Sequence, residues 1–283
     1  MTVDRRSVLR SASRLAAFGA AGGLVAACGG PSDGKGANGP SVAARPQPAH
    51  LAESPSAGPS LSPSPSASAS PSATPFALPP LAPDTPQEVV SGPHSRPQLA
   101  LTFHGQGDPA IANALLTTAE QHGARLTVLA VGSWLDEQPQ IAQRILSGGH
   151  ELGNHTQNHL DISTMRPEQA HEEIAQCAQR LERLTGSIGR WFRPSATQYA
   201  NAMVKEQARQ VGYAHVLSFD VDPHDYADPG ADTVTRRVLK AAAAGSVVAL
   251  HMGHPGTVTA LPAILDGLTQ KGLHAVTASE LCA

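Results

Sequence analysis

Two histidines four residues apart, His155 and His159, are residues whose type and spacing suggest chemistry. At this spacing two imidazoles project from the same side of a helical turn, where both can reach one metal ion. A pair of exposed turn residues has the same spacing, so the pair alone does not establish a site. The pattern predicts a divalent metal site if other polar residues are brought close to it.

Strand-like and helix-like stretches alternate along the C-terminal part of the chain. The first helix has Asp108 as N-cap with Pro109 at its first position, and glycines such as Gly186 end the helices. Such alternation implies parallel strands, and either a closed barrel or an open doubly wound sheet satisfies it. Strands are expected at residues 98–103, 125–131, 151–154, 190–193, 213–219, 246–250 and 275–277, and helices between 109 and 123 and at 139–147, 167–185, 201–211, 232–244 and 261–271.

Polar, titratable side chains follow five of these predicted strands. In a βα barrel the chemistry lies at the C-terminal ends of the strands, so these side chains are expected to face one another. A random scatter of the 13 histidines would rarely produce this arrangement. The candidate site residues are, in chain order, His104, His155, Arg193, Asp222, Asp225 and His251.

Four segments together resemble motifs of the polysaccharide deacetylase family, which is the NodB-homology family or carbohydrate esterase family four. Their order and spacing agree with that family over nearly all of residues 97–283. In motif order the segments are GHELGNHTQNH at 149–159, WFRP at 191–194, DPHDY at 222–226 with Tyr226 where an indole is usual, and VVALH at 247–251.

The resemblance implies an α/β fold, a distorted (β/α) barrel, and removal of N-acetyl groups from cell-wall or chitin-like polysaccharide. In such enzymes an aspartate and two histidines hold a divalent metal, commonly zinc, which polarises the acetamide carbonyl and activates a water. By position, His155 and His159 correspond to the two histidine ligands. The implied partner is therefore a glycan.

The same resemblance implies roles for four residues of the later motifs. His251 corresponds to the general acid that protonates the leaving amine. Arg193 would orient the region of the base. Asp222 or Asp225 would tune His251, because a nearby carboxylate favours the imidazolium form.

The first motif departs from the family pattern. The family has two adjacent aspartates after Thr-Phe, the first a base and the second a metal ligand. Here His104 occupies the position of the base and Gly105 that of the ligand, and Gly105 has no side chain with which to coordinate. Residues 195–197 (SAT) also replace a Pro-aromatic-Gly run that shapes the substrate groove.

Three hypotheses for His104 remain open. In the first it is a third metal ligand beside His155 and His159, which is a known catalytic zinc set, and the base comes from elsewhere. In the second it is the base, and the metal keeps two protein ligands. In the third the site is inactive and the groove only binds glycan. The sequence therefore predicts either a metal-dependent N-deacetylase or a lapsed deacetylase-fold lipoprotein.

Residues 1–28 have the features of a twin-arginine lipoprotein signal peptide. Arg5 and Arg6 precede a weak apolar run that is too short to span a bilayer as a helix. Small residues before Cys28 resemble a lipobox, so Cys28 is the predicted lipidation site. The expected location is extracytoplasmic, either anchored to the membrane at the cell envelope or secreted.

Residues 29–95 are a predicted disordered linker. Sixteen of the 24 prolines lie between residues 31 and 97, and Pro- and Ser-rich sequence buries too little apolar surface to offset its backbone entropy. Residues 96–283 are ample for one core. The net charge of -3, without a basic block beyond the N-terminus, argues against nucleic acid as a partner. Cys177 and Cys282 are either a disulfide or free thiols.

Overall fold

The computed structural model describes residues 78–283. The predicted signal peptide at 1–28, lipidation at Cys28 and the linker up to residue 77 lie outside the described residues. Among the residues that are described, no helix is both long and apolar enough to cross a membrane.

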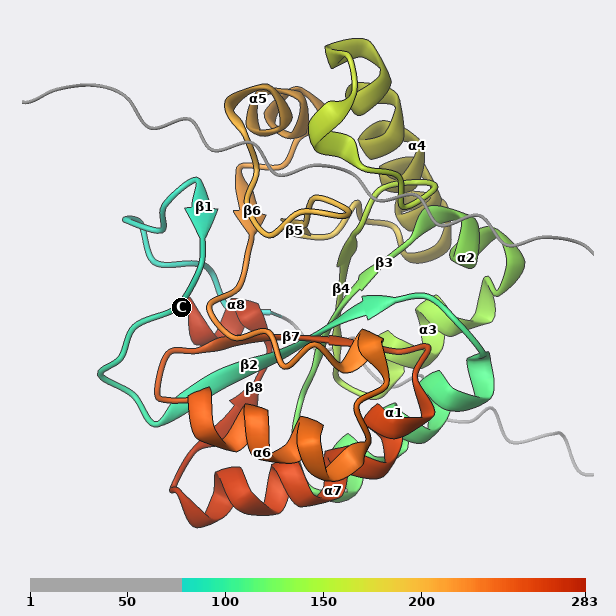
Figure 1. Cartoon of the computed structure of the whole chain (residues 1–283). Coiled ribbons are helices and arrows are strands. Elements are labelled where there is room, and N and C mark those ends of the chain that lie inside the picture. The colour runs from blue at the N-terminus through green and yellow to red at the C-terminus, as the bar shows by residue number, and fades with distance from the viewer. Residues whose placement is uncertain (1–77) are drawn as a thin grey trace, which may run out of the picture. The chain divides into compact units, whose positions relative to one another are not determined.

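Eight parallel strands form the centre of the described chain (Figure 1). Their bounds are β1 Glu88–Val89, β2 Gln98–Gly105, β3 Thr127–Ala130, β4 Glu151–Asn154, β5 Trp191–Phe192, β6 His215–Leu217, β7 Val247–His251 and β8 His274–Val276. The order is β1-β6-β5-β4-β3-β2-β7, and β8 pairs with β2. Val221, which follows β6, forms a parallel bridge with Val248 of β7. This bridge closes the sheet, so the predicted distorted barrel is confirmed.

The helices follow the strands and cover the outside of the barrel (Figure 1). Their bounds are α1 Pro109–Gln121, α2 Gly132–Glu137, α3 Gln140–Ser147, α4 Pro167–Thr185, α5 Ala202–Val211, α6 Ala231–Ala241, α7 Pro255–Gln270 and α8 Ala278–Leu281, with short 3-10 helices at Ile162–Thr164 and Asp225–Ala227. Asp108 caps α1 by accepting a 2.7 Å hydrogen bond from the amide of Ala110, as predicted. α2 and α8 were not predicted, and α7 begins six residues before the predicted start at 261.

Side chains of β2 alternate between the two faces of the barrel wall. Leu99, Leu101 and Phe103 are fully buried in the layer between strands and helices. Ala100 packs instead with residues of the barrel interior such as Trp191. Because successive side chains of a strand point to opposite faces, His104 follows Ala100 inward while position 105 faces the helices.

Packed structure begins before the predicted domain boundary at residue 96. Residues 78–95, here called the N-terminal strap, pack on the barrel and contribute β1, which pairs with β6. Arg190 also donates a 2.6 Å hydrogen bond to the carbonyl of Pro79. The sequence predicts a linker here because its prolines obscure a strand of only two residues.

Cys177 and Cys282 are both free and buried in the described structure. Burial raises the pKa of the Cys177 thiol to about 12. Of the two alternatives left open by the sequence, the structure therefore has the buried free thiols.

Candidate active site

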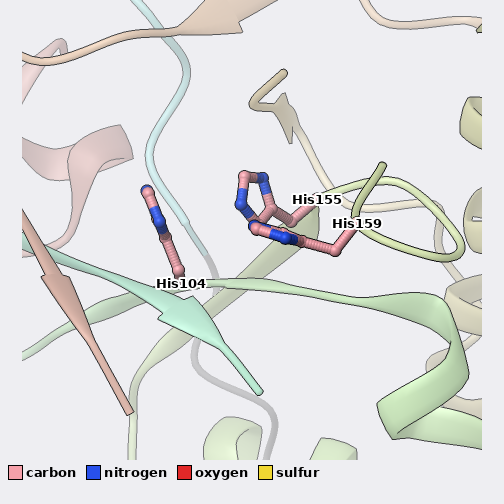
Figure 2. A group of neighbouring side chains, drawn as sticks. All are labelled: His104, His155 and His159. Atoms are coloured by element: carbon pink, nitrogen blue, oxygen red, sulfur yellow. The ribbon is translucent and has the colours of Figure 1, made fainter. Parts of the chain in front are cut away.

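Three histidines lie together at the C-terminal ends of β2 and β4 (Figure 2). His104 belongs to β2, whereas His155 and His159 belong to the loop after β4. One ring nitrogen from each lies within 4.8 Å of the others. The ring centroids of His104 and His155 are 4.4 Å apart, and those of His155 and His159 are 4.8 Å apart. The three predicted metal ligands are therefore brought together.

The loop that carries His155 and His159 is not the helical turn that the sequence predicted. Thr156 and His159 have φ values of 67° and 56°, in the left-handed region. Asn154 Oδ1 accepts a 2.8 Å bond from the amide of Thr156, and Thr156 Oγ1 accepts a 3.2 Å bond from the amide of His159. The two rings converge because this loop turns back on itself, not because of helical spacing.

Two residues outside the loop hold it in place. Glu173 on α4 accepts hydrogen bonds from the amide and the side chain of Asn158, at 2.8 and 2.6 Å. Ser195, from the altered third motif, accepts a 3.2 Å bond from Thr156 Oγ1 and donates to the carbonyl of Leu160. Neither was predicted as a site residue. The departure of residues 195–197 from the family pattern was the one available signal for Ser195.

The histidine cluster has the chemistry of a metal site. His155 Nδ1 is bonded to the carbonyl of Arg193 at 3.0 Å, so it is the donor and the lone pair is on Nε2. The Nε2 atoms of His155 and His104 are buried without a hydrogen-bond partner among the described residues. Burial, together with the neighbouring imidazoles, lowers the pKa of both rings well below 6.5. Neutral imidazole is the form that binds metals, so these residues fit a divalent ion.

The space beside Gly105, where a ligand side chain would start, is filled by neighbouring residues. A Cβ added there would lie 2.8 Å from Val128 Cγ1, 3.0 Å from Ala130 Cα and 3.1 Å from the ring of Trp134. These neighbours belong to the layer between strands and helices. A carboxylate at this position would therefore point away from the histidines into space that is already filled.

His251 lies beside the cluster and is paired with Asp225. It is the register partner of His104 on the neighbouring strand, and the two ring centroids are 4.4 Å apart. Asp225 accepts bonds from His251 Nδ1 at 2.8 Å, from the His251 amide at 2.9 Å and from Thr257 Oγ1 at 2.7 Å. Burial raises the pKa of Asp225, but these hydrogen bonds outweigh it and leave the pKa lowered.

Asp222 does not contact His251 by a hydrogen bond. Its Oδ1 accepts a 2.8 Å bond from the amide of His224 instead. Of the two carboxylates left open by the sequence, Asp225 is therefore the partner of His251. Nearby, His254 Nδ1 lies 2.9 Å from Asp228 Oδ1.

Arg193 is buried beneath the cluster. Its guanidinium donates to the carbonyls of Leu217 and Ser218 and to Thr102 Oγ1, at 2.8, 3.2 and 2.8 Å. None of these partners in the described chain is a carboxylate, and burial lowers its pKa to about 9. Its backbone oxygen contacts His155. Arg193 thus supports His155 and the barrel interior, and none of its hydrogen-bond partners in the described chain is a carboxylate that could act as a base.

His104, His159 and His251 line a cleft of about 540 Å³. Tyr226 is half-exposed on its rim, with its ring centroid 5.2 Å from that of His251. The described residues that line it are His104, Gln106, His159, Ala196, Thr197, Gln198, Phe219, Asp222, Tyr226, Ala249, His251 and His254. An apolar groove of similar volume, about 550 Å³, is lined by leucines such as Leu152 and contains none of the predicted site residues.

Comparisons with known sequences identify relatives of this chain. The profile of the polysaccharide deacetylase family matches residues 91–216. A peptidoglycan-N-acetylglucosamine deacetylase of Bacillus cereus is 34% identical over 193 residues, which cover 67% of this chain and 90% of that protein. A chitooligosaccharide deacetylase of Bradyrhizobium sp. is 30% identical over 206 residues, covering 65% of this chain and 88% of that protein.

Solved structures have the same fold. A peptidoglycan N-acetylglucosamine deacetylase superposes with a TM-score of 0.65 at 29% identity, covering 69% of this chain and 92% of that one. A pseudoenzyme of carbohydrate esterase family four from Bacillus anthracis gives a TM-score of 0.66 at 22% identity over 70% of each chain, a likeness of fold alone. Its motifs, its barrel and these relatives together show that the chain belongs to the polysaccharide deacetylase family.

Proposed function

We propose that this protein is a metal-dependent deacetylase that cleaves the amide bond of N-acetyl groups on cell-wall or chitin-like polysaccharide. The observation that carries the proposal is that three imidazoles gather beside the His251–Asp225 pair, and that His104, His159 and His251 of these residues line one cleft. The relatives named for peptidoglycan and chitooligosaccharide support an N-acetylated glycan as the substrate class.

His104, His155 and His159 would hold the metal, with zinc as the commonest occupant of such a set. A divalent ion there supplies Lewis acidity, which polarises the acetamide carbonyl and activates a water. The inward direction of His104 and its unpartnered Nε2 favour the ligand role over the base role. The Gly105 position contributes nothing to this set.

His251 would protonate the leaving amine. Asp225 engages its Nδ1, which fixes the ring and leaves Nε2 as the nitrogen that faces substrate. With His104 assigned to the metal, the base comes from another residue. Among the described residues that line the cleft, Asp222 is the one that carries a carboxylate, and we assign it the role of the base.

The alternative is a catalytically lapsed protein that binds glycan without hydrolysing it. Two observations favour it: the filled space at Gly105 and the lack of a carboxylate beside Arg193. The metal content of the purified protein, measured together with acetate release from a chitin oligomer and from peptidoglycan, separates the two. Bound metal with acetate release supports the enzyme, whereas glycan binding without acetate supports the alternative.

We further propose that a lipid on Cys28 anchors the protein at the cell envelope. The support is the sequence of residues 1–28 alone. Cys28→Ala should move the protein from the membrane fraction to the medium. A variant that stays with the membrane to the same extent would contradict lipidation.

A further inference from the structure

We propose that Glu88, on the N-terminal strap, is a positioning residue that holds one wall of the cleft in the shape that binds glycan. The wall consists of four residues that line the cleft, Ala196, Thr197, Gln198 and Phe219. Glu88 lies just before residues 91–216, which match the family profile. The inference rests on the proposed function, because it concerns the same cleft.

Glu88 joins the two chain segments that form this wall. One oxygen, Oε1, accepts a hydrogen bond from the amide of Ala200 at 2.8 Å and another from Ser218 Oγ at 2.8 Å. The other oxygen, Oε2, lies 2.6 Å from Nζ of Lys205 on α5. One carboxylate thus ties the strap to the segment after β5, to the segment after β6 and to α5.

Gln198 and Phe219, which line the cleft, lie within two residues of Ala200 and Ser218, the residues that donate to Glu88. Gln198 donates a 2.8 Å hydrogen bond to the carbonyl of Phe219, which joins the two halves of the wall directly. The ring of Phe219 lies 6.3 Å from that of His104 and 5.3 Å from the guanidinium carbon of Arg193. The wall that Glu88 holds is therefore the side of the cleft next to the metal ligands.

Backbone pairing fixes where Glu88 lies. The amides of Val216 and Ser218 donate to the carbonyls of Gln87 and Val89, at 2.7 and 2.8 Å. The Glu88 side chain is partly buried, and burial alone would raise its pKa. The bonds from Lys205, Ala200 and Ser218 outweigh burial and lower it, so the carboxylate is ionised at neutral pH.

Removing the carboxylate should loosen the wall and spare the metal site. The loop that carries His155 and His159 is held by Glu173 and Ser195, with which Glu88 shares no hydrogen bond. Loss of Glu88 should therefore weaken glycan binding, while metal occupancy stays unchanged. This separation distinguishes positioning of the wall from general stabilisation.

The test uses the full mature chain with three variants: Glu88→Ala, Glu88→Gln and Lys205→Met. Glutamine keeps an acceptor for Ala200 and Ser218, and Lys205→Met removes only the ion pair. Binding of a chitin pentasaccharide is measured by calorimetry, metal content by mass spectrometry, and exchange of individual amides by NMR. We expect Glu88→Ala to weaken pentasaccharide binding and to speed exchange of the Ala200 amide, each about tenfold, from the loss of one partly buried acceptor.

Glu88→Gln and Lys205→Met should stay within about threefold of the wild type. Glutamine keeps the acceptor for Ala200 and Ser218, and Lys205→Met removes only an ion pair that solvent still reaches in part. The exchange of the Asn158 amide, which donates to Glu173, is the internal control and should not change. Unaltered pentasaccharide binding in Glu88→Ala would overturn the positioning role alone. The same conclusion would follow if exchange of the Ala200 and Asn158 amides became faster by the same factor. A wild type that binds no pentasaccharide would overturn the proposed function and this inference together.

Discussion

The histidine cluster and the His251–Asp225 pair are neighbours, since the rings of His104 and His251 are 4.4 Å apart, yet the polar atoms of the two groups differ in their hydrogen bonding. In the pair, the oxygens of Asp225 accept three hydrogen bonds from His251 and Thr257. In the cluster, the Nε2 atoms of His104 and His155 are buried without partners in the described chain. A buried polar atom without a partner is costly, so the cluster is suited to an external cation and the pair is complete without one.

The comparison also shows where the family pattern changed. By the sequence resemblance, the pair has the residues of the fourth and fifth motifs, whereas His104 and Gly105 stand where the first motif has two aspartates. Around Gly105 the packing is filled by Val128 and by Trp134, whose Nε1 donates a 2.9 Å bond to the carbonyl of Gly107. The change at the first motif is therefore built into the surrounding packing and is not confined to two side chains.

The largest expected effect comes from breaking the pair. His251→Ala should lower kcat by about 10²–10⁴-fold, which is the usual contribution of a general acid. Its metal content should equal that of the wild type, because the three ligands remain. Acetate release and metal content of the same preparation are the measurements. Loss of metal in this variant would mean that His251 belongs to the cluster.

The next effect concerns the cluster. His104→Ala should weaken zinc affinity about as much as His155→Ala does, roughly 100-fold for removal of one of three protein ligands. Competition with a chromophoric chelator measures it, and His254→Ala is the matched control, since His254 is paired with Asp228 outside the cluster. Normal zinc affinity with acetate release abolished would identify His104 as the base instead.

A smaller effect is expected from adding a side chain at Gly105. Gly105→Asp should lower the free energy of unfolding by about 1–3 kcal/mol, the usual cost of overpacking. Gly256→Ala is the control, because a Cβ there meets nothing within 4 Å. Urea denaturation measures both. The double variant His104→Asp with Gly105→Asp should gain no activity, and activity gained over an inactive wild type would show that a carboxylate at 105 does reach the site.

The smallest effect comes from the support of the cluster. Ser195→Ala removes the hydroxyl that joins Thr156 to the carbonyl of Leu160, and should weaken zinc affinity by about fivefold, or roughly 1 kcal/mol. Thr259→Ala, an exposed hydroxyl bonded within α7, is the control. Zinc affinity equal to the wild type would mean that Glu173 alone is enough to hold the loop.

The amino-acid sequence by itself determined the alternation of strands and helices and the strand ends at which polar residues gather. The bounds of β4 and α4 were predicted as they occur, because periodicity and capping are local properties. It also carried the motifs of the family. It missed β1, because a strand of two residues depends on hydrogen bonds to β6, which lies more than a hundred residues later in the chain.

Only the tertiary structure decided how the site residues relate to one another. It brought His155 and His159 together through a left-handed loop, paired His251 with Asp225 rather than Asp222, and turned position 105 away from the histidines. Each of these outcomes depends on which face of a strand a side chain occupies and on contacts between distant segments. Residue types and local spacing do not contain that information, because it arises only when the barrel closes.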